Sequence, residues 1–512
     1  MGLRRCLISL FLAGLCAVVA LVPAPPIAAG AADPVGAYLD SVRNEPGRLA
    51  AFLRDMPKGA DLHMHLSGAT STESLLRFAV ADRRCIDSAT LEASEAPCHT
   101  GQRAAADTDR DPAFRDAVIA AWSMKGFTPG AESGHDHFFA TFGKFDLAGD
   151  GHAGDMLAEV AARAVGQNEY YIEPLVTPGF AAAQALAQKV GYDADLAAMR
   201  NRMTAKGAMD RIVAGVSKDV DAAFHRMRAV LRCSSGGEAD AACDLPVRLD
   251  YQVLRAFPPE VVFAQMLLGF ELTAKDRRFV GINLVQPEDD PVARRDYRLH
   301  MQMLAFLRGH YPKGHLTLHA GELTGALAPA EDLRFHIRDA VFVAGAERIG
   351  HGVDIAGEDR AADTLHAMAQ SHVLVEIALT SNDQILGVKG ADHPFGLYRR
   401  SGVPVALVTD DEGVSRTDLT AQYQRAVTTY DLGYGDLKAM ARAALQHGFL
   451  AGADLWRGPD DFQPGAECGK DRPGAPQPRT SACRALIRSS RKAKAEWDQE
   501  AGLARFERRY GG

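Results

Sequence analysis

The residues best suited to chemistry are histidines and acids that follow short apolar runs. The segment GADLHMHLSG, residues 59–68, places His63 and His65 one residue apart. Because successive side chains of a strand point to opposite faces, histidines with this spacing point to the same side, as two ligands of one ion must. The alternative is an alternating strand that carries two imidazoles without a metal. The pair alone does not decide between the two.

Further polar residues close other short apolar runs. HLTLHAGE ends with His319 and Glu322, RIGHG with His351, and VPVALVTDD with Asp410 and Asp411. Three neutral imidazole nitrogens and one carboxylate oxygen suit zinc, with a position left open for water in a catalytic site. Adjacent acids after an apolar strand are costly to bury without a cation, although two solvated loop carboxylates are the simpler alternative. Together these residues indicate one divalent metal site.

The elements that would bring these residues together are strands alternating with helices. Between residues 59 and 455, β-branched or apolar runs are separated by longer Ala- and Leu-rich stretches with helical spacing. Repeated strand, helix, strand order predicts parallel strands with right-handed crossovers. About eight such runs predict a closed (β/α)₈ TIM barrel, an α/β fold in which reactive side chains gather at the carboxyl ends of the strands.

Composition divides the chain into four parts. Residues 1–32 carry two arginines, an apolar run and then small residues, a pattern typical of an export signal. A membrane anchor is the alternative, because the run approaches the ~20 residues that span a bilayer. The remaining parts are a helical lead (33–58), the barrel (59–455, with an insertion at about 80–135), and a loop with an amphipathic C-terminal helix (456–512). The signal predicts a periplasmic or secreted protein.

Six cysteines beyond the predicted signal fall into three near-neighbour pairs that bracket polar loops. The pairs are Cys85 with Cys98, Cys233 with Cys243, and Cys468 with Cys483. In an oxidising compartment this pattern predicts three local disulfides, and six free thiols are the alternative. A zinc site built from these cysteines is not supported, because the sequence contains no CxxC.

Five ordered segments, MPKGADLHMHLSGA, LHAGE, RIGHG, TSND and VTDD, resemble the adenosine deaminase family of metal-dependent amidohydrolases. The similarity covers roughly residues 50 to 450, and the signal and cysteine loops resemble its secreted, growth-factor-related branch. The zinc deaminases with an HxE and PCxxC signature do not match, because Pro97-Cys98 has no second cysteine at that spacing. The resemblance implies one zinc ion per chain, held by His63, His65, His319 and Asp410.

The resemblance also implies roles for three other residues. Glu322 would protonate the purine ring nitrogen beside the attacked carbon, His351 would orient and help deprotonate the attacking water, and Asp411 would hold the hydroxide and contact the ring. Zinc lowers the pKa of bound water to about 7, and an aromatic amine leaves readily only after the ring is protonated. The implied reaction converts adenosine or a related 6-aminopurine nucleoside to its 6-oxo product and ammonia.

Three departures from the family pattern concern the substrate. Ser67 stands where the family commonly has an aspartate that meets the ribose hydroxyl. GINLVQPE has Asn283 for an aspartate and Gln286 for a glycine, and no proline precedes TSND. Ser67 and Gln286 are therefore the predicted substrate contacts. Adenosine, deoxyadenosine, a 6-substituted nucleoside and free adenine all remain open as substrates.

Two other functions compete with deamination. One is an amidohydrolase that acts on a different amine or amide, and the other is an extracellular nucleoside-binding or signalling protein. Glu322, His351 and Asp411 argue against the second, since a binder needs no proton donor beside a metal. The expected partner is a small-molecule purine nucleoside, because a formal net charge of -8 without a long basic cluster disfavours nucleic acid. We expect no membrane contact after signal removal, and the oligomeric state stays open.

Overall fold

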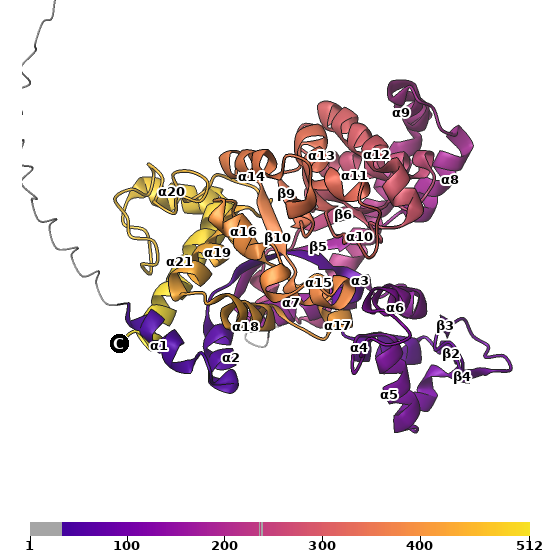
Figure 1. Cartoon of the computed structure of the whole chain (residues 1–512), viewed down its shortest axis with the longest axis horizontal. Coiled ribbons are helices and arrows are strands. Elements are labelled where there is room, and N and C mark those ends of the chain that lie inside the picture. The colour runs from indigo at the N-terminus through magenta and orange to yellow at the C-terminus, as the bar shows by residue number, and fades with distance from the viewer. Residues whose placement is uncertain (1–32, 235, 237–238) are drawn as a thin grey trace, which may run out of the picture.

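The computed structural model describes residues 33–234, 236 and 239–512 (Figure 1). Eight strands form one parallel sheet in the order β1-β5-β6-β7-β8-β9-β10-β11. They are β1 (Gly59–His65), β5 (Glu169–Val176), β6 (Leu249–Leu254), β7 (Phe279–Val285), β8 (His315–Ala320), β9 (Arg348–His351), β10 (Leu374–Ile377) and β11 (Val405–Leu407). The predicted (β/α)₈ barrel is confirmed. The predicted export signal, residues 1–32, lies outside the described residues.

The sheet closes between its first strand and the residues that follow its last strand. Met64 and Asp410 form a parallel bridge. The backbone N–H of Asp410 donates to the carbonyl of His63 at 2.9 Å, and the N–H of His65 donates to the carbonyl of Asp410 at 3.1 Å. The closure of the barrel therefore involves the same residues that carry candidate metal ligands.

Helices separate the barrel strands along the chain and cover the sheet. They are α7 (Ala153–Gly166), α8 (Phe180–Val190), α9 (Leu196–Thr204), α10 (Ala208–Val230), α11 (Pro259–Lys275), α12 (Pro291–His310), α13 (His336–Asp339), α14 (Ala361–Gln370), α15 (Leu379–Leu386) and α16 (Phe395–Arg400). A short π-helix, η6 (Ala340–Ala344), follows α13. Along β7 the side chains alternate between these helices and the barrel interior, as strand geometry requires. Ile282 faces Gly269 of α11, whose missing side chain lets this helix approach the strand closely, and the neighbouring Asn283 meets His319 of β8.

The chain on either side of the barrel strands packs into one helical cap. The predicted lead forms two helices, α1 (Pro34–Val42) and α2 (Pro46–Asp55), because Pro46 starts a second helix at its first turn. The predicted C-terminal amphipathic helix is α21 (Arg491–Tyr510), and Phe506 of this helix lies 4.9 Å from Phe52 between ring centroids. Figure 1 shows α1 and α2 beside α21. The other helices after β11 are α17 (Glu412–Ser415), α18 (Leu419–Tyr430), α19 (Tyr434–Gln446) and α20 (Ser481–Ser489).

The segment predicted as an insertion carries a small structure of its own. After α3 (Leu66–Ala69) and α4 (Thr72–Ala81), strands β2 (Cys85–Asp87), β3 (Ala93–Ser94) and β4 (Gln102–Ala104) form an antiparallel sheet in the order β3-β2-β4. Helices α5 (Pro112–Ala121) and α6 (Gly134–Gly149) follow, and α6 packs on α4 and α15. Figure 1 shows the small sheet and α5 to one side of the barrel.

Three disulfides join the cysteine pairs expected from the sequence, Cys85–Cys98, Cys233–Cys243 and Cys468–Cys483. The first closes a loop of the small sheet. The third lies in a separate apolar cluster with Trp456 and Trp497, beneath α20 and α21. Within the described residues, no helix is both long and apolar enough to cross a bilayer.

Candidate metal centre and active site

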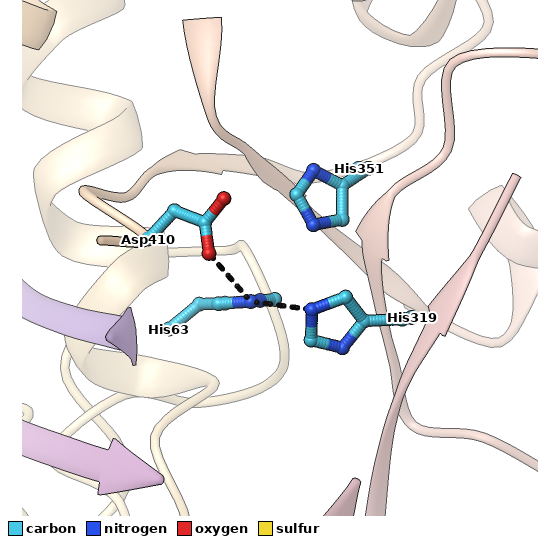
Figure 2. A group of neighbouring side chains, drawn as sticks. All are labelled: His63, His319, His351 and Asp410. Atoms are coloured by element: carbon cyan, nitrogen blue, oxygen red, sulfur yellow. Dashed lines mark hydrogen bonds and ion pairs between the residues drawn. The ribbon is translucent and has the colours of Figure 1, made fainter. Parts of the chain in front are cut away.

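Residues from four strand ends converge at one mouth of the barrel (Figure 2). His63 and His65 belong to β1, His319 to β8 and His351 to β9, and Asp410 follows β11. The Nε2 atoms of His63 and His319 are 3.1 Å apart, and Asp410 Oδ1 lies 3.5 Å from His63 Nε2 and 3.3 Å from His65 Nε2. Parallel strands bring their carboxyl ends to one side, so residues far apart in sequence meet here.

Two overlapping groups of possible ligands share Asp410. One contains His63, His319, His351 and Asp410, and the other contains His65, Asp410 and Asp411; within each group the candidate ligand atoms lie within 4.8 Å of one another. The residues of the predicted zinc set are divided between the two groups, which share Asp410: His63 and His319 lie in the first and His65 in the second. Distance alone would therefore favour His351 over His65 as the third imidazole beside His63 and His319.

Hydrogen bonds on the far side of each ring distinguish the histidines. Three of them face an oxygen acceptor through Nδ1, in the pairs His63–Glu376 (2.8 Å), His65–Gln252 (2.9 Å) and His319–Asn283 (2.9 Å). The backbone N–H of His319 also donates to Asn283 Oδ1, which fixes the orientation of that amide. Because the acceptor oxygens require a proton on Nδ1, the neutral form of each of these three rings presents the lone pair of Nε2 to the centre of the site.

These converging lone pairs fit a bound cation. Two neutral imidazole nitrogens 3.1 Å apart repel each other unless a proton or an ion lies between them. A proton is disfavoured, because burial and the neighbouring His63 hold the pKa of His319 well below its ordinary value. Burial acts to raise the pKa of Asp410, but the adjacent His65 and the other surrounding imidazoles hold it well below its ordinary value. Three nitrogens and one carboxylate oxygen match the donor set of a zinc site with an open position.

The acceptor for His63 is held in its charged form. Glu376 Oε1 accepts hydrogen bonds from Arg348 Nε at 2.6 Å and Thr317 Oγ1 at 2.7 Å. Burial acts to raise the pKa of Glu376, but the positive charge of Arg348 outweighs it, so the net shift is downward. An ionised carboxylate is the acceptor that keeps the proton of His63 on Nδ1.

Glu322 and Asp411 are buried acids beside the ligand cluster. Burial, reinforced by the charge of Asp410, raises the pKa of Glu322 well above its ordinary value. Burial likewise raises the pKa of Asp411. Glu322 Oε1 and Asp411 Oδ1 have no hydrogen-bond partner among the described residues. A carboxyl group kept protonated at neutral pH can donate a hydrogen bond or a proton to a ligand.

The turn that carries Glu322 is clamped from β7. Glu288 accepts hydrogen bonds from the backbone N–H groups of Gly321 and Glu322 at 3.1 and 2.9 Å, and His336 Nδ1 bonds the same carboxylate. The buried Glu288 therefore fixes the backbone from which Glu322 projects. This residue was not predicted from the sequence, although an acid shortly after an apolar strand, the first of the three in PEDD, was the available signal.

A cavity of about 890 Å³ opens beside the cluster, a size suited to a small organic ligand. Its lining includes Glu322, Asp410 and Asp411, both predicted substrate contacts, Ser67 and Gln286, and the aromatic rings of Phe138 and Phe142. The two phenylalanines come from α6, whose contribution the sequence did not reveal, because it depends on packing after the insertion. Gly68 of α3 lies against Asp411. A Cβ at Gly68 would be 1.8 Å from Asp411 Oδ1, so only glycine lets the Asp411 side chain come this close to α3.

Three residues at the mouth of the barrel adopt left-handed backbone conformations, which residues other than glycine rarely take. They are Gln286 (φ 79°), His351 (φ 66°) and Asp410 (φ 62°). Gln286, where the family has glycine, keeps the conformation natural to glycine by anchoring its side chain, since Oε1 accepts from the backbone N–H of Ala256 at 2.9 Å. Strain of this kind persists where surrounding structure enforces it, as at functional sites.

This molecule is a (β/α)₈ barrel protein. Imidazole and carboxylate donors gather at the carboxyl ends of its strands. Within that class, the chain belongs to the adenosine deaminase family. The family model described as adenosine deaminase matches residues 159–454, more than half of the 512 residues. The matched range includes Asn283, His319, Glu322, His351 and Asp410, and the two histidines of β1 precede it.

Individual relatives give weaker but consistent similarity. An adenosine deaminase of Mycobacterium ulcerans (strain Agy99) is 27% identical over 235 residues, covering 44% of this chain and 60% of the relative. An adenosine deaminase of Enterococcus faecalis (strain ATCC 700802 / V583) is 35% identical over 137 residues, covering 27% and 37%. The match thus spans about 60% or less of these relatives' lengths.

Among solved structures, the N6-methyl-AMP deaminase of Arabidopsis thaliana in its apo form aligns with a TM-score of 0.51. The two chains are 23% identical, and the alignment covers 78% of this chain and 94% of the other. Similarity at this level of identity describes a shared barrel fold.

Proposed function

We propose that this protein is a zinc-dependent hydrolase that releases ammonia from adenosine or a related 6-aminopurine nucleoside and leaves the 6-oxo product. The observation that carries the proposal is the convergence of three Nε2 lone pairs and the Asp410 carboxylate beside two buried acids and a cavity. Membership in the adenosine deaminase family supports the reaction type. An amidohydrolase acting on another amine or amide would use the same centre and is the main alternative.

His63, His65, His319 and Asp410 would hold the zinc ion, because Asp410 Oδ1 lies beside the Nε2 atoms of His63 and His65, and His63 Nε2 lies 3.1 Å from His319 Nε2. When bound, zinc would supply an acidified water at neutral pH, since it lowers the pKa of bound water to about 7. His351, which has a ring nitrogen within 4.8 Å of donor atoms of His63, His319 and Asp410, would orient the attacking water. Glu376, Gln252 and Asn283 hold the imidazoles in the ligating tautomer.

Glu322 is the proposed acid. Its raised pKa keeps a proton on the carboxyl at neutral pH, and its Oε1 lacks a partner among the described residues, so it is available to a purine ring nitrogen. Protonation there draws electrons from carbon 6 and makes the amine a better leaving group. Asp411, which follows Asp410 after β11 and lines the same cavity as Glu322, would hold the attacking oxygen and contact the ring.

The cavity lining favours a substrate without phosphate. Three further acids, Asp146, Asp150 and Asp219, line the cavity, and no lysine or arginine is among the lining residues that the structure describes. A 5′-phosphate entering this cavity would meet carboxylates instead of the guanidinium or ammonium groups that recognise it. We therefore place nucleosides and free bases ahead of nucleotides.

The decisive experiment measures ammonia release by purified protein whose zinc content is known. The substrates are adenosine, deoxyadenosine, a 6-substituted purine nucleoside, adenine and AMP, and for the 6-substituted nucleoside the 6-oxo product is measured instead, because its leaving group is not ammonia. We expect turnover of nucleosides to exceed that of AMP, with one zinc ion per chain. Zinc-loaded protein that releases ammonia from none of these purines, but from another amine or amide, would establish the alternative instead.

Glu322→Gln provides the matched inactive variant. The amide keeps the shape of the side chain but cannot give up a proton, so turnover should fall by about 10²- to 10⁴-fold. Zinc content and the thermal unfolding temperature should remain those of the parent. Unchanged turnover would remove Glu322 from the mechanism.

We also propose export to the periplasm or the exterior. Three disulfides support this, because disulfides persist in oxidising compartments. Cell fractionation with sequencing of the mature N-terminus tests it. A protein recovered from the cytosol with its first residues intact would contradict the proposal.

A further inference from the structure

A chain of buried hydrogen bonds leads from the backbone to His351. The N–H of Phe395, the first residue of α16, donates to His393 Nδ1 at 3.1 Å. His393 Nε2 lies 3.0 Å from Asn382 Oδ1 on α15, and Asn382 Nδ2 lies 2.9 Å from His351 Nδ1. His393, Asn382 and His351 are 3%, 0% and 1% exposed. Water therefore does not replace any of these partners.

The direction of this chain is fixed at its first bond. A backbone N–H can only donate, so His393 Nδ1 must accept. Burial lowers the pKa of His393 to about 4, so the ring is neutral near pH 7 and carries its one proton on Nε2. That proton is donated to Asn382 Oδ1. The amide then presents its N–H to His351, and a neutral His351 must carry its proton on Nε2.

His351 thus differs from the three proposed ligands. Their Nδ1 atoms face oxygen acceptors, whereas His351 Nδ1 faces an amide donor. Figure 2 shows the other nitrogen of His351 on the side of the ring that faces His63, His319 and Asp410. This Nε2 is buried and has no hydrogen-bond partner among the described residues. Glu322 Oε1 lies 3.5 Å from Nδ1, too far to compete well with Asn382.

We propose that Asn382 and His393 are positioning residues that hold His351 in the Nε2–H tautomer, so that it faces the metal centre as a hydrogen-bond donor. It is then excluded from the ligand set, which leaves His65 as the third imidazole. The consequence for catalysis rests on the proposed function. A neutral His351 in this tautomer can donate to the attacking oxygen and cannot take its proton, which revises the deprotonating role implied by the sequence resemblance.

The primary test reads the tautomer directly in metal-free protein labelled with ¹⁵N-histidine. Long-range ¹H–¹⁵N spectra distinguish the protonated from the unprotonated ring nitrogen, and a His351→Gln spectrum assigns the resonances. We expect the proton of His351 on Nε2. A proton on Nδ1 would overturn the proposal. Because no substrate is involved, this result stands even if the deaminase assignment fails.

Asn382→Asp tests whether the amide sets the tautomer. A carboxylate accepts hydrogen bonds from both neighbours, so it keeps the bond from His393 but requires a proton on His351 Nδ1. We expect the ¹⁵N pattern of His351 to invert at pH values above neutrality, where two donors keep the aspartate ionised. A pattern that stays like the parent would overturn the positioning role.

Two further variants separate positioning from general damage. His393→Gln retains an N–H that can reach Asn382, whereas His393→Leu does not, so the first should preserve the tautomer and the second should lose it. In the zinc-loaded enzyme, Asn382→Asp and His393→Leu should lower kcat at least tenfold while KM changes little. Ser381→Ala is the control, because among the described residues this buried hydroxyl hydrogen-bonds to the Ala378 carbonyl and to no member of the chain that leads to His351. Equal loss in Ser381→Ala would contradict a specific effect.

Discussion

Four histidines meet at the ends of β1, β8 and β9, and the atom that each Nδ1 faces sets what the rest of the ring can do. A carboxylate or amide oxygen turns the ring into a ligand, and an amide N–H turns it into a donor. The partner atom of Nδ1 therefore decides whether a histidine at this site acts as a metal ligand or as a hydrogen-bond donor. The same logic applies to the acids, since Asp410 is held ionised while burial keeps Glu322 protonated.

Gly68 offers a test at the scale of a single methyl group. A Cβ at this position would lie 1.8 Å from Asp411 Oδ1 and 2.6 Å from its Cγ, so Gly68→Ala must displace the Asp411 side chain. We expect kcat to fall at least tenfold while zinc content stays at one per chain. Steady-state kinetics with metal analysis measures both.

The control for Gly68 is Gly215→Ala in α10, where a Cβ meets nothing within 4 Å. This variant should keep the activity of the parent and a similar or higher stability, since alanine favours helices. Full activity in Gly68→Ala would show that the placement of Asp411 does not matter to turnover.

The residues that touch the proposed ion were predictable from sequence, and their supporting partners were not. Histidines and acids at strand ends are visible because an apolar run precedes each one. Gln252 and Glu376 act only through contacts with His65 and His63, which lie more than a hundred residues away. The sequence gives one signal for Glu376, because it is a lone acid inside the apolar run VLVEIAL.

At the scale of elements, Glu288 links the end of β7 to the turn after β8. Glu288→Gln replaces one accepting oxygen with a donor, which must oppose a backbone N–H of Gly321 or Glu322 or the ring of His336. Leaving such buried groups unsatisfied costs about 1–3 kcal/mol. We expect a lower unfolding temperature and a kcat reduced at least tenfold, measured by thermal denaturation and by kinetics.

Glu331→Gln is the matched control for Glu288, because this exposed acid lies outside the clamp. It should leave both quantities unchanged. If Glu288→Gln lowered stability without affecting kcat, the clamp would support the fold but not the placement of Glu322.

The disulfide between Cys468 and Cys483 should stabilise the C-terminal segment formed by α20 and the loop before it. It closes a loop with a sequence separation of 15, for which chain entropy predicts about 3 kcal/mol. Replacing both cysteines with serine should lower the unfolding temperature and expose the segment before α20 to proteolysis. Calorimetry and limited proteolysis measure these effects, and an unchanged unfolding temperature in reductant would contradict them.

The eight barrel strands could be predicted because each is an apolar run bounded by polar residues. The small sheet β3-β2-β4 could not, since its strands are two or three residues long and depend on pairing across an irregular loop. This segment was therefore not resolved into elements from the sequence. The role of α6 as a cavity wall was missed for the same reason, because tertiary contacts with α4 and α15 place it.

At the scale of the whole molecule, buried acids link stability to pH. Burial raises the pKa of Glu358 and of Glu496 to about 8 each. Between the unfolded value near 4.5 and about 8, the folded state binds more protons than the unfolded state, so raising the pH lowers the free energy of unfolding. Glu358→Gln removes one such group and should gain stability relative to the parent as the pH rises through this window.

The comparison with the parent matters because buried histidines act in the opposite direction. Burial lowers the pKa of His300 and of His393 to about 4, so they favour the folded state above their unfolded value of about 6.5 and withdraw that support as the pH falls. Thermal denaturation of parent and variant from about pH 5.5 to about pH 8.5 isolates the glutamate. A difference between the two that stays constant with pH would contradict the assignment.

The barrel closes where the backbone of Asp410 bonds to His63 and His65. A divalent ion held by the side chains of the same three residues would link β1 to the segment after β11, at the point where the barrel closes. Metal binding would then stabilise the whole barrel as well as supply its chemistry. Without the ion, the barrel would be less stable where β1 meets the segment after β11.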